Sequence, residues 1–173
     1  MAAAEGAKIR VTDTRKTTPG LRALEKYAVR AGGGANHRSD LASGILIKDN
    51  HVALVGSVRE AVRRARATAP HTLRVAVEVD DLDQLEEALE AGAEGILLDN
   101  FQLRDMAEAV KRIRDRRPQT VIEASGGVSL DRIRDISKTG IDVVSIGALT
   151  HSARAINYSC EIRPAEGTPR PTR

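Results

Sequence analysis

One stretch near the start of the chain decides how the rest is interpreted: Asp13-Thr14-Arg15-Lys16-Thr17-Thr18-Pro19-Gly20-Leu21-Arg22. It follows a strand-like run at Ile9 and Val11 and precedes a helix-like run, which predicts a loop between a strand and a helix. Such loops lie at the carboxyl ends of parallel strands, where α/β proteins keep their binding sites. Arg15 and Lys16 place two cations beside a helix start that Pro19 favours, and this combination is typical of an anion site. The alternative is a solvated basic turn, and the stretch alone does not separate the two.

The composition excludes several classes of protein. A chain of 173 residues with 41% hydrophobic residues makes one domain with a real core. Aromatic residues make up only 2%, and the net charge of +3 is spread out, so we expect no nucleic-acid binding. The single cysteine, Cys160, excludes an internal disulfide and fits a reducing compartment. No apolar run is long enough to span a membrane and no signal pattern opens the chain, so the prediction is a cytoplasmic protein without a membrane segment.

Strands and helices alternate along the sequence in about six units. Apolar runs predict strands at 45–47, 73–79, 95–98, 120–122 and 141–146. Helical stripes lie between them, and the first one comprises Leu21, Leu24, Tyr27 and Ala28. Ser57, Asp81 and Ser129 are the predicted N-caps of three later helices. Near-continuous apolar strands buried on both faces indicate a parallel sheet with helices outside.

Two α/β folds compete for this pattern. An open doubly wound sheet normally has a glycine-rich dinucleotide turn after its first strand, and the sequence has none. Here almost every strand ends in its own reactive group, as in a TIM-type barrel, but a complete barrel takes roughly 250 residues. We therefore predict an incomplete TIM-like α/β barrel of about six parallel strands over residues 1–162. Residues 163–173, rich in Pro, Arg and Thr, are predicted to be a disordered tail.

Charged and glycine-rich groups gather at the predicted strand ends. They are Arg15, Lys16, Lys48, Glu78, Asp99, Ser125, Gly126, Gly127, Gly147 and His151. A single charge at a buried strand end is more often structural, but several in register predict a functional site. The cations, together with Arg38 and His37, suit a carboxylated or phosphorylated ligand.

The acidic and glycine-rich members suggest a reaction type. Glu78 and Asp99 end neighbouring strands, so they can share a Mg²⁺ ion or face a developing cation; the alternative is salt bridges to the same lysines. The glycines at 126–127 and 147 precede helix starts, where backbone N–H groups can cradle a phosphate, although such glycines are commonly mere turns. His37 and His151 fit polar contacts better than metal ligands. Cations beside carboxylates suit a reaction that binds a diphosphate with Mg²⁺ and passes through a cationic sugar centre.

At this point the motifs resemble a known family. They are the stretch 13–22, Gly32-Gly33-Gly34 with Asn36-His37-Arg38, Leu46-Ile47-Lys48-Asp49-Asn50-His51, Glu78-Val79, Leu97-Leu98-Asp99-Asn100, Glu123-Ala124-Ser125-Gly126-Gly127, and Gly147-Ala148-Leu149-Thr150-His151-Ser152. In this order they are similar to quinolinate phosphoribosyltransferase, which is also called nicotinate-nucleotide pyrophosphorylase (carboxylating). In NAD biosynthesis this enzyme runs in the decarboxylating direction. The similarity runs from about Ile9 to Ile162.

The resemblance implies an activity and residue roles. The family makes nicotinate mononucleotide, pyrophosphate and CO₂ from quinolinate and phosphoribosyl pyrophosphate, with Mg²⁺. The implied substrate-binding residues are Thr14, Arg15, Lys16, His37, Arg38, Lys48, Ser125, Gly126, Gly127, Gly147, Ala148 and His151. The implied catalytic residues are Lys16, Glu78 and Asp99, and the last two would also bind the metal.

One departure from the family pattern qualifies these expectations. Family members carry an amino-terminal α/β domain before the barrel, and in their dimers it covers the partner's site and adds an arginine. The sequence matches the barrel portion, so we expect a homo-oligomer, a dimer or higher, and weak or no turnover from this chain alone. Two alternatives are a non-catalytic barrel that binds phosphate ligands or oligomerises, and a related transferase that uses nicotinate.

Overall fold

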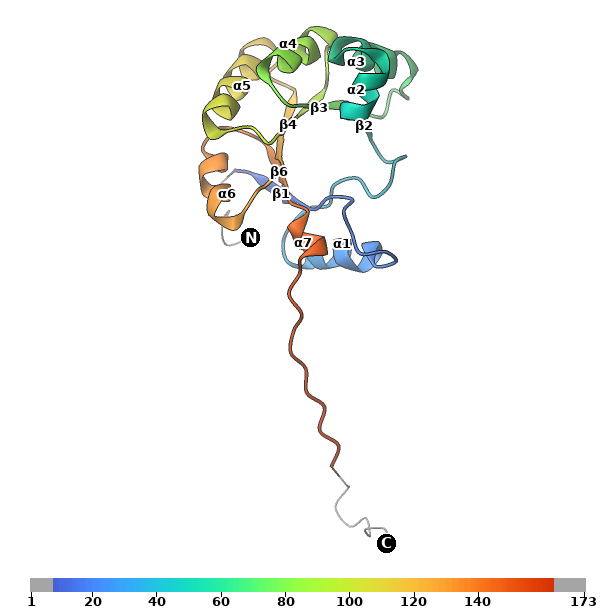
Figure 1. Ribbon diagram of the computed structural model, residues 1–173, viewed down its shortest axis with the longest axis vertical. Helices are drawn as coiled ribbons and strands as arrows, with labels where there is room; N and C mark the ends of the chain where they lie inside the picture. The colour runs from blue at the N-terminus through green and yellow to red at the C-terminus, as the bar shows by residue number, and fades with distance from the viewer. Residues whose placement is uncertain (1–7, 164–173) are drawn as a thin grey trace, which may run out of the picture.

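Six parallel strands form one curved sheet with helices on its outer side (Figure 1). The computed structural model describes residues 8–163. The strands are β1 (Arg10–Thr12), β2 (Ile45–Ile47), β3 (Val75–Val79), β4 (Gly95–Asp99), β5 (Val121–Ser125) and β6 (Val143–Ser145). The helices are α1 (Arg22–Ala31), α2 (Asp49–Val55), α3 (Val58–Thr68), α4 (Leu82–Ala91), α5 (Leu103–Arg116), α6 (Leu130–Ser137) and α7 (Ala148–His151).

The strand order shows a barrel that does not close. Along the sheet the order is β1-β6-β5-β4-β3-β2, so β1 and β2 lie at the two edges. Within residues 8–163 no strand pairing joins these edges; β1 has an isolated parallel bridge from Thr12 to Ala35 instead. This arrangement confirms the predicted incomplete α/β barrel of six parallel strands. The predicted disordered tail, apart from the exposed Arg163, lies outside the described residues and stays a prediction.

Local sequence signals explain most of the helix boundaries. The Ser57 hydroxyl accepts the Glu60 backbone N–H at 3.2 Å, and the Asp81 carboxylate accepts the Gln84 N–H at 2.8 Å. Both predicted caps are therefore confirmed. Ser129 occupies the N-cap position of α6, but its side chain makes no capping hydrogen bond, so that part of the prediction is wrong.

Helix α2 was not predicted. The sequence indicated only that the strand stops at Lys48, yet a helix begins directly after it. The ring of His51 accepts the Lys48 backbone N–H at 2.9 Å through Nδ1 and so closes the first turn. No residue of α2 is fully buried, and its apolar residues are the four successive ones from Val52 to Val55, a run too short to show the period of a helix.

The hydrophobic core lies between the sheet and its outer helices. Val77, Leu98, Ile122 and Val144 contribute one buried side chain from each of four adjacent strands. Strands β3 and β5 alternate between buried and partly exposed residues, and β4 alone among them is buried through four successive residues. The expectation that the strands are buried on both faces is therefore wrong for β3 and β5. Their inner faces line a cavity rather than a packed barrel interior.

The buried face of helix α1 is not the one that carries the predicted apolar stripe. Leu24 and Tyr27 are 66% and 70% exposed, whereas Lys26 and Val29 are buried. Lys26 is drawn inward by a buried carboxylate, described below. The apolar stripe of this helix is therefore left on the outside of the described part of the chain.

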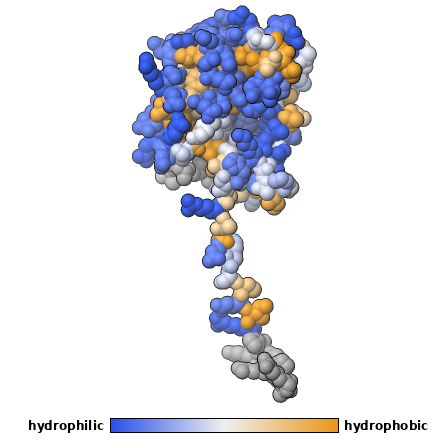
Figure 2. Space-filling model, viewed as in Figure 1, coloured by the Kyte–Doolittle hydropathy of each residue, from blue (hydrophilic) through white to orange (hydrophobic). Residues whose placement is uncertain are grey.

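The segment after α7 stands apart from the rest of the molecule. Residues 153–163 have no helix or strand assignment and every one of them is exposed. Figure 2 shows this segment projecting from the body, with hydrophobic and hydrophilic side chains mixed along it. Across residues 8–163, no helix combines the length and apolarity that crossing a membrane requires.

Truncating a buried leucine should lower the free energy of unfolding far more than truncating an exposed one. Leu98 is fully buried in the central strand β4, so Leu98→Ala should lower the free energy of unfolding by about 2–5 kcal/mol through lost transfer energy and the cavity left behind. Leu54→Ala is the control, because Leu54 is 85% exposed on α2, and its effect should stay within about 0.5 kcal/mol. Urea unfolding measures both. Equal effects would contradict this description of the core.

Candidate active site

One cavity of about 770 Å³ opens at the carboxyl ends of the strands. Every residue predicted for the site lines it: Thr14, Arg15, Lys16, His37, Arg38, Lys48, Glu78, Asp99, Ser125, Gly126, Gly127, Gly147, Ala148 and His151. Residues from the inner face of the sheet complete the lining: Leu46, Leu97, Asn100, Glu123, Val128, Ser145 and Ile146. Strand ends far apart in the sequence therefore meet at one site, as the barrel geometry predicts.

Three successive strands each bring a carboxylate to this cavity. Glu78 on β3 and Glu123 on β5 are both paired in register with Leu97, and Asp99 lies two residues further along β4. The Lys48 ammonium forms an ion pair with Glu78 Oε2, which realises the salt-bridge alternative for that residue. Asp99 forms no ion pair within residues 8–163, and its Oδ2 accepts a hydrogen bond from Asn100 Nδ2 at 2.8 Å. Of the three carboxylates, only that of Glu78 forms an ion pair with a lysine or arginine within the described residues, and Asp99 is left free of a cation.

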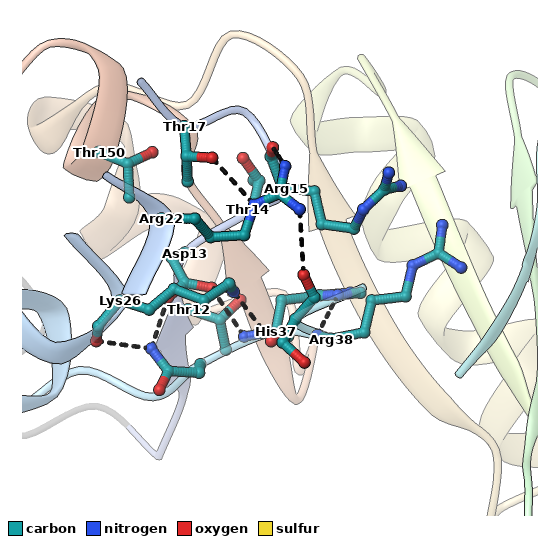
Figure 3. Close-up of polar contacts among 12 residues, drawn as sticks. Thr12, Asp13, Thr14, Arg15, Thr17, Arg22, Lys26, His37, Arg38 and Thr150 are labelled. Atoms are coloured by element: carbon teal, nitrogen blue, oxygen red, sulfur yellow. Dashed lines mark hydrogen bonds and ion pairs between the residues drawn. The ribbon is translucent and has the colours of Figure 1, made fainter. Parts of the chain in front are cut away.

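The opposite side of the cavity carries cations without carboxylate partners. Arg15, Lys16 and Arg38 form no ion pair in the described part of the chain. The guanidinium groups of Arg15 and Arg38 extend side by side (Figure 3). Burial, and next the charge of Arg15, lower the pKa of Arg38 below its ordinary value. Arg15 Nε is buried without a hydrogen-bond partner, so an anion placed here would satisfy groups that the protein leaves unpaired.

A buried network holds the cationic side in place. Asp13 is fully buried and accepts three donors: Lys26 Nζ at 2.5 Å, Asn36 Nδ2 at 2.5 Å and the His37 backbone N–H at 2.9 Å (Figure 3). Lys26 Nζ also donates to the His37 carbonyl at 3.0 Å. The network joins the end of β1 to α1 and to the segment that carries His37 and Arg38.

Hydrogen bonds occupy both ring nitrogens of His37. Nδ1 accepts the Arg38 backbone N–H at 2.8 Å, so the ring hydrogen is assigned to Nε2, which lies 3.2 Å from Glu123 Oε2. In this arrangement His37 has no free ring N–H for a ligand. The predicted contact between His37 and a ligand carboxylate stays a prediction.

Two glycines of the site lie close to neighbouring residues, and at Gly126 the approach requires glycine. Gly126 has a φ of +82°, and a Cβ added there would lie 2.2 Å from Asn100 Oδ1 and 2.9 Å from the Asn100 nitrogen. A Cβ at Gly147 would lie 2.9 Å from His151 Nε2. The backbone N–H groups of Gly126, Gly127 and Gly147 donate to no acceptor within residues 8–163. The two glycine segments can therefore present free donors to an anion.

Sequence reasoning missed three contributors to this site. Glu123 belongs to a quoted motif, and the two-residue period of a strand places it on the same face as Ser125, so that signal was present. Asn100 has a positive φ of 55° and supports Asp99. Lys26 gave no signal, because one lysine in a helix is normally solvent-exposed.

The residues present offer limited ligation to a metal. Across the part of the chain that the structure describes, no three His, Cys, Asp or Glu side chains are grouped closely enough to hold a metal ion. Asp99 is a free carboxylate at the cavity, and Glu78 would have to share with Lys48. This set suits an ion such as Mg²⁺ that keeps waters and binds substrate phosphates along with one or two carboxylates.

Fold and site together define an α/β barrel with a mixed-charge anion-binding cavity at the carboxyl ends of its strands. The family model described as the C-terminal domain of quinolinate phosphoribosyl transferase matches residues 1–161. The chain therefore belongs to the quinolinate phosphoribosyltransferase family, and the resemblance seen in the sequence motifs is confirmed.

Individual relatives agree with this assignment. The protein of Mycobacterium leprae named nicotinate-nucleotide pyrophosphorylase [carboxylating] is 51% identical over 160 residues, which are 92% of this chain and 56% of that protein. The human protein of the same name is 43% identical over 161 residues, 93% of this chain and 54% of its own. The solved structure of NadC from Streptococcus pyogenes is 47% identical with a TM-score of 0.84, covering 91% of this chain and 54% of that one. The chain spans about half the length of these relatives.

The contact at Gly126 can be tested by substitution. Gly56→Ala is the matched control, because Gly56 also has a positive φ but nothing lies within 4 Å of the added Cβ. We expect Gly56→Ala to cost about 1–2 kcal/mol of unfolding free energy from left-handed backbone alone. Gly126→Ala should cost more, because the methyl group also meets the Asn100 backbone. Equal costs in urea unfolding would show that the approach of Gly126 to Asn100 is not tight.

Proposed function

We propose that this chain carries the site for phosphoribosyl transfer from phosphoribosyl pyrophosphate to quinolinate, with decarboxylation. The products are nicotinate mononucleotide, pyrophosphate and CO₂, a step of NAD biosynthesis. The observation that carries the proposal is the cavity in which unpaired Arg15, Lys16 and Arg38 face the carboxylates of Glu78 and Asp99. Membership of the family and the names of its relatives support the same reaction.

The cationic side of the cavity is the place for the pyridine diacid. Two adjacent carboxylates on an aromatic ring need two donors with planar, charged N–H groups, and Arg15 and Arg38 offer these side by side. Lys16 and Lys48 supply further positive charge toward the neighbouring phosphate. Thr14 and His151 flank Gly147, where backbone N–H groups would take phosphate oxygens together with those of Ser125, Gly126, Gly127 and Ala148.

The acidic side is the place for the ribose. Bond breaking at the sugar develops positive charge on the ring, and fixed carboxylates directed at that charge lower the barrier. Asp99 and Glu78 take this role in the proposal, and Asp99 would hold Mg²⁺ with the diphosphate. When bound, such an ion would neutralise charge on the departing pyrophosphate. After transfer, the quaternised pyridinium nitrogen stabilises the electron pair left on carbon when CO₂ departs, and that carbon then takes up a proton to give nicotinate mononucleotide.

The assembly of the chain is part of the proposal. The cavity is open, whereas this type of catalysis depends on excluding water and on positioning. We infer that an amino-terminal α/β domain of a partner subunit covers the site in a homo-oligomer. Exposed Leu24 and Tyr27 on α1, together with Ile156 and Tyr158 in the segment after α7, offer apolar surface for such contacts. A cytoplasmic location fits the one exposed, free cysteine, Cys160.

The reaction can be tested directly. The chain is incubated with quinolinate, phosphoribosyl pyrophosphate and Mg²⁺, first alone and then with an amino-terminal domain taken from a relative, and CO₂ and nicotinate mononucleotide are measured. We expect turnover in the presence of the added domain and little without it. Lys16→Ala and Glu78→Gln should each reduce this turnover by about 10²–10³-fold, since each removes charge stabilisation at the reacting centre. Glu90→Gln, on the outer surface of α4, is the control for loss of a carboxylate.

Two outcomes would overturn the proposal. Tight binding of phosphate without any CO₂ release, with or without the added domain, would favour a non-catalytic barrel. If nicotinate competed equally with quinolinate, a transferase for nicotinate would be favoured. Equal competition would show that the paired guanidinium groups do not bind the second carboxylate of quinolinate.

A further inference from the structure

Glu123 is the charged residue of the cavity to which the sequence motifs assigned no role. It lies on the inner face of β5, between Leu97 of β4 and Val143 of β6 in register, and its side chain is 14% exposed. The neighbouring carboxylates have partners of a different kind, Glu78 with Lys48 and Asp99 with Asn100. Among residues 8–163, the side chain of Glu123 hydrogen-bonds to His37 alone.

The contact with His37 has a defined polarity. Because His37 Nδ1 already accepts the Arg38 backbone N–H, the hydrogen of a neutral ring lies on Nε2 and points toward Glu123 Oε2. A hydrogen on Nδ1 would point at the Arg38 N–H, whose nitrogen lies 2.8 Å from Nδ1. The His37 ring thus bridges the Glu123 carboxylate and the Arg38 backbone N–H.

The backbone on either side of this ring is fixed independently. The His37 N–H and carbonyl are bound by Asp13 and Lys26, and the Arg38 guanidinium donates to the Gly44 carbonyl at 2.8 Å. The His37 carbonyl and the Arg38 N–H belong to one planar peptide group, which Lys26 holds on its carbonyl side and the His37 ring holds on its N–H side. A ring that rotated away would remove one of the two contacts that hold this peptide, and the Arg38 backbone would be fixed less firmly.

We propose that Glu123 is a positioning residue for the diacid: it holds the His37 ring so that Arg38 stays beside Arg15 at the spacing that two adjacent carboxylates require. The inference rests on the proposed function and deepens it. His37 then acts as a spacer between Glu123 and the Arg38 backbone. The negative charge of Glu123 also offsets part of the repulsion between the two guanidinium groups, since it lies close enough to act on Arg38.

A ring-specific measurement tests the contact without any ligand. Nitrogen-15 NMR of the chain should show His37 with its hydrogen on Nε2, and that hydrogen should exchange slowly with water. Glu123→Gln keeps an acceptor, so the hydrogen should remain slow but shift upfield as the charge is lost. Glu123→Ala removes the acceptor, and the hydrogen should exchange rapidly. A hydrogen on Nδ1, or ring signals unchanged in Glu123→Ala, would overturn the proposal.

A binding measurement tests the consequence for the ligand. Glu123→Gln and Glu123→Ala both remove the charge, so the difference between them reports the hydrogen bond to His37 alone. We expect quinolinate, measured by calorimetry, to bind Glu123→Ala about tenfold more weakly than Glu123→Gln, a difference of about 1.4 kcal/mol. Equal affinities of the two variants would overturn the proposal.

A control variant and the ring spectra separate failure of this inference from failure of the proposed function. Glu90→Ala removes a carboxylate on the outer face of α4, which pairs with Arg59 away from the cavity, and quinolinate affinity should not change. If the unsubstituted chain bound no quinolinate, the proposed function would fail, while the ring spectra would still decide whether Glu123 positions His37.

Discussion

The buried ion pair between Asp13 and Lys26 is the constraint on which the cationic half of this molecule depends. A buried carboxylate is costly unless it is paired and hydrogen-bonded, and Asp13 has three donors that fill this requirement. Those donors come from α1 and from the segment that precedes Arg38. Satisfying one carboxylate therefore brings three parts of the chain together and sets where Arg15 and Arg38 lie. The pair contributes position more than net stability, because its desolvation offsets much of its attraction.

The second feature is a barrel whose interior was not filled. In a complete barrel, layers of bulky side chains from alternate strands pack the centre. Here the corresponding inner positions carry Glu78, Asp99, Glu123 and Ser125, so the centre remains a polar cavity. Most of the hydrophobic core lies between the sheet and the outer helices, and buried Leu97 and Ile146 also line the cavity. The strands can thus present charged groups inward without losing the apolar packing that stabilises them.

Much of the fold and the composition of the site could be predicted from sequence, for a physical reason. Strand ends of a parallel sheet meet at one edge, so residues such as Lys48 and Asp99 could be placed together without knowing any contact. Caps such as Asp81 were equally local. The inward face of α1 could not be predicted, because Lys26 is buried only through its contact with Asp13, and the apolar pattern pointed the other way. The contact between Glu123 and His37 could not be predicted for the same reason, since the two residues are distant in sequence.

The most direct test of the positioning role of the buried pair is amide hydrogen exchange in Lys26→Met. This substitution leaves the Asp13 carboxylate buried without its cation, and Lys26 itself does not line the cavity. If the pair sets position, the amides of Ala35 and His37 should lose most of their protection, while those of Val77 and Ile122 in the middle of the sheet keep theirs. An unchanged His37 amide, or an equal loss across the whole sheet, would contradict the account.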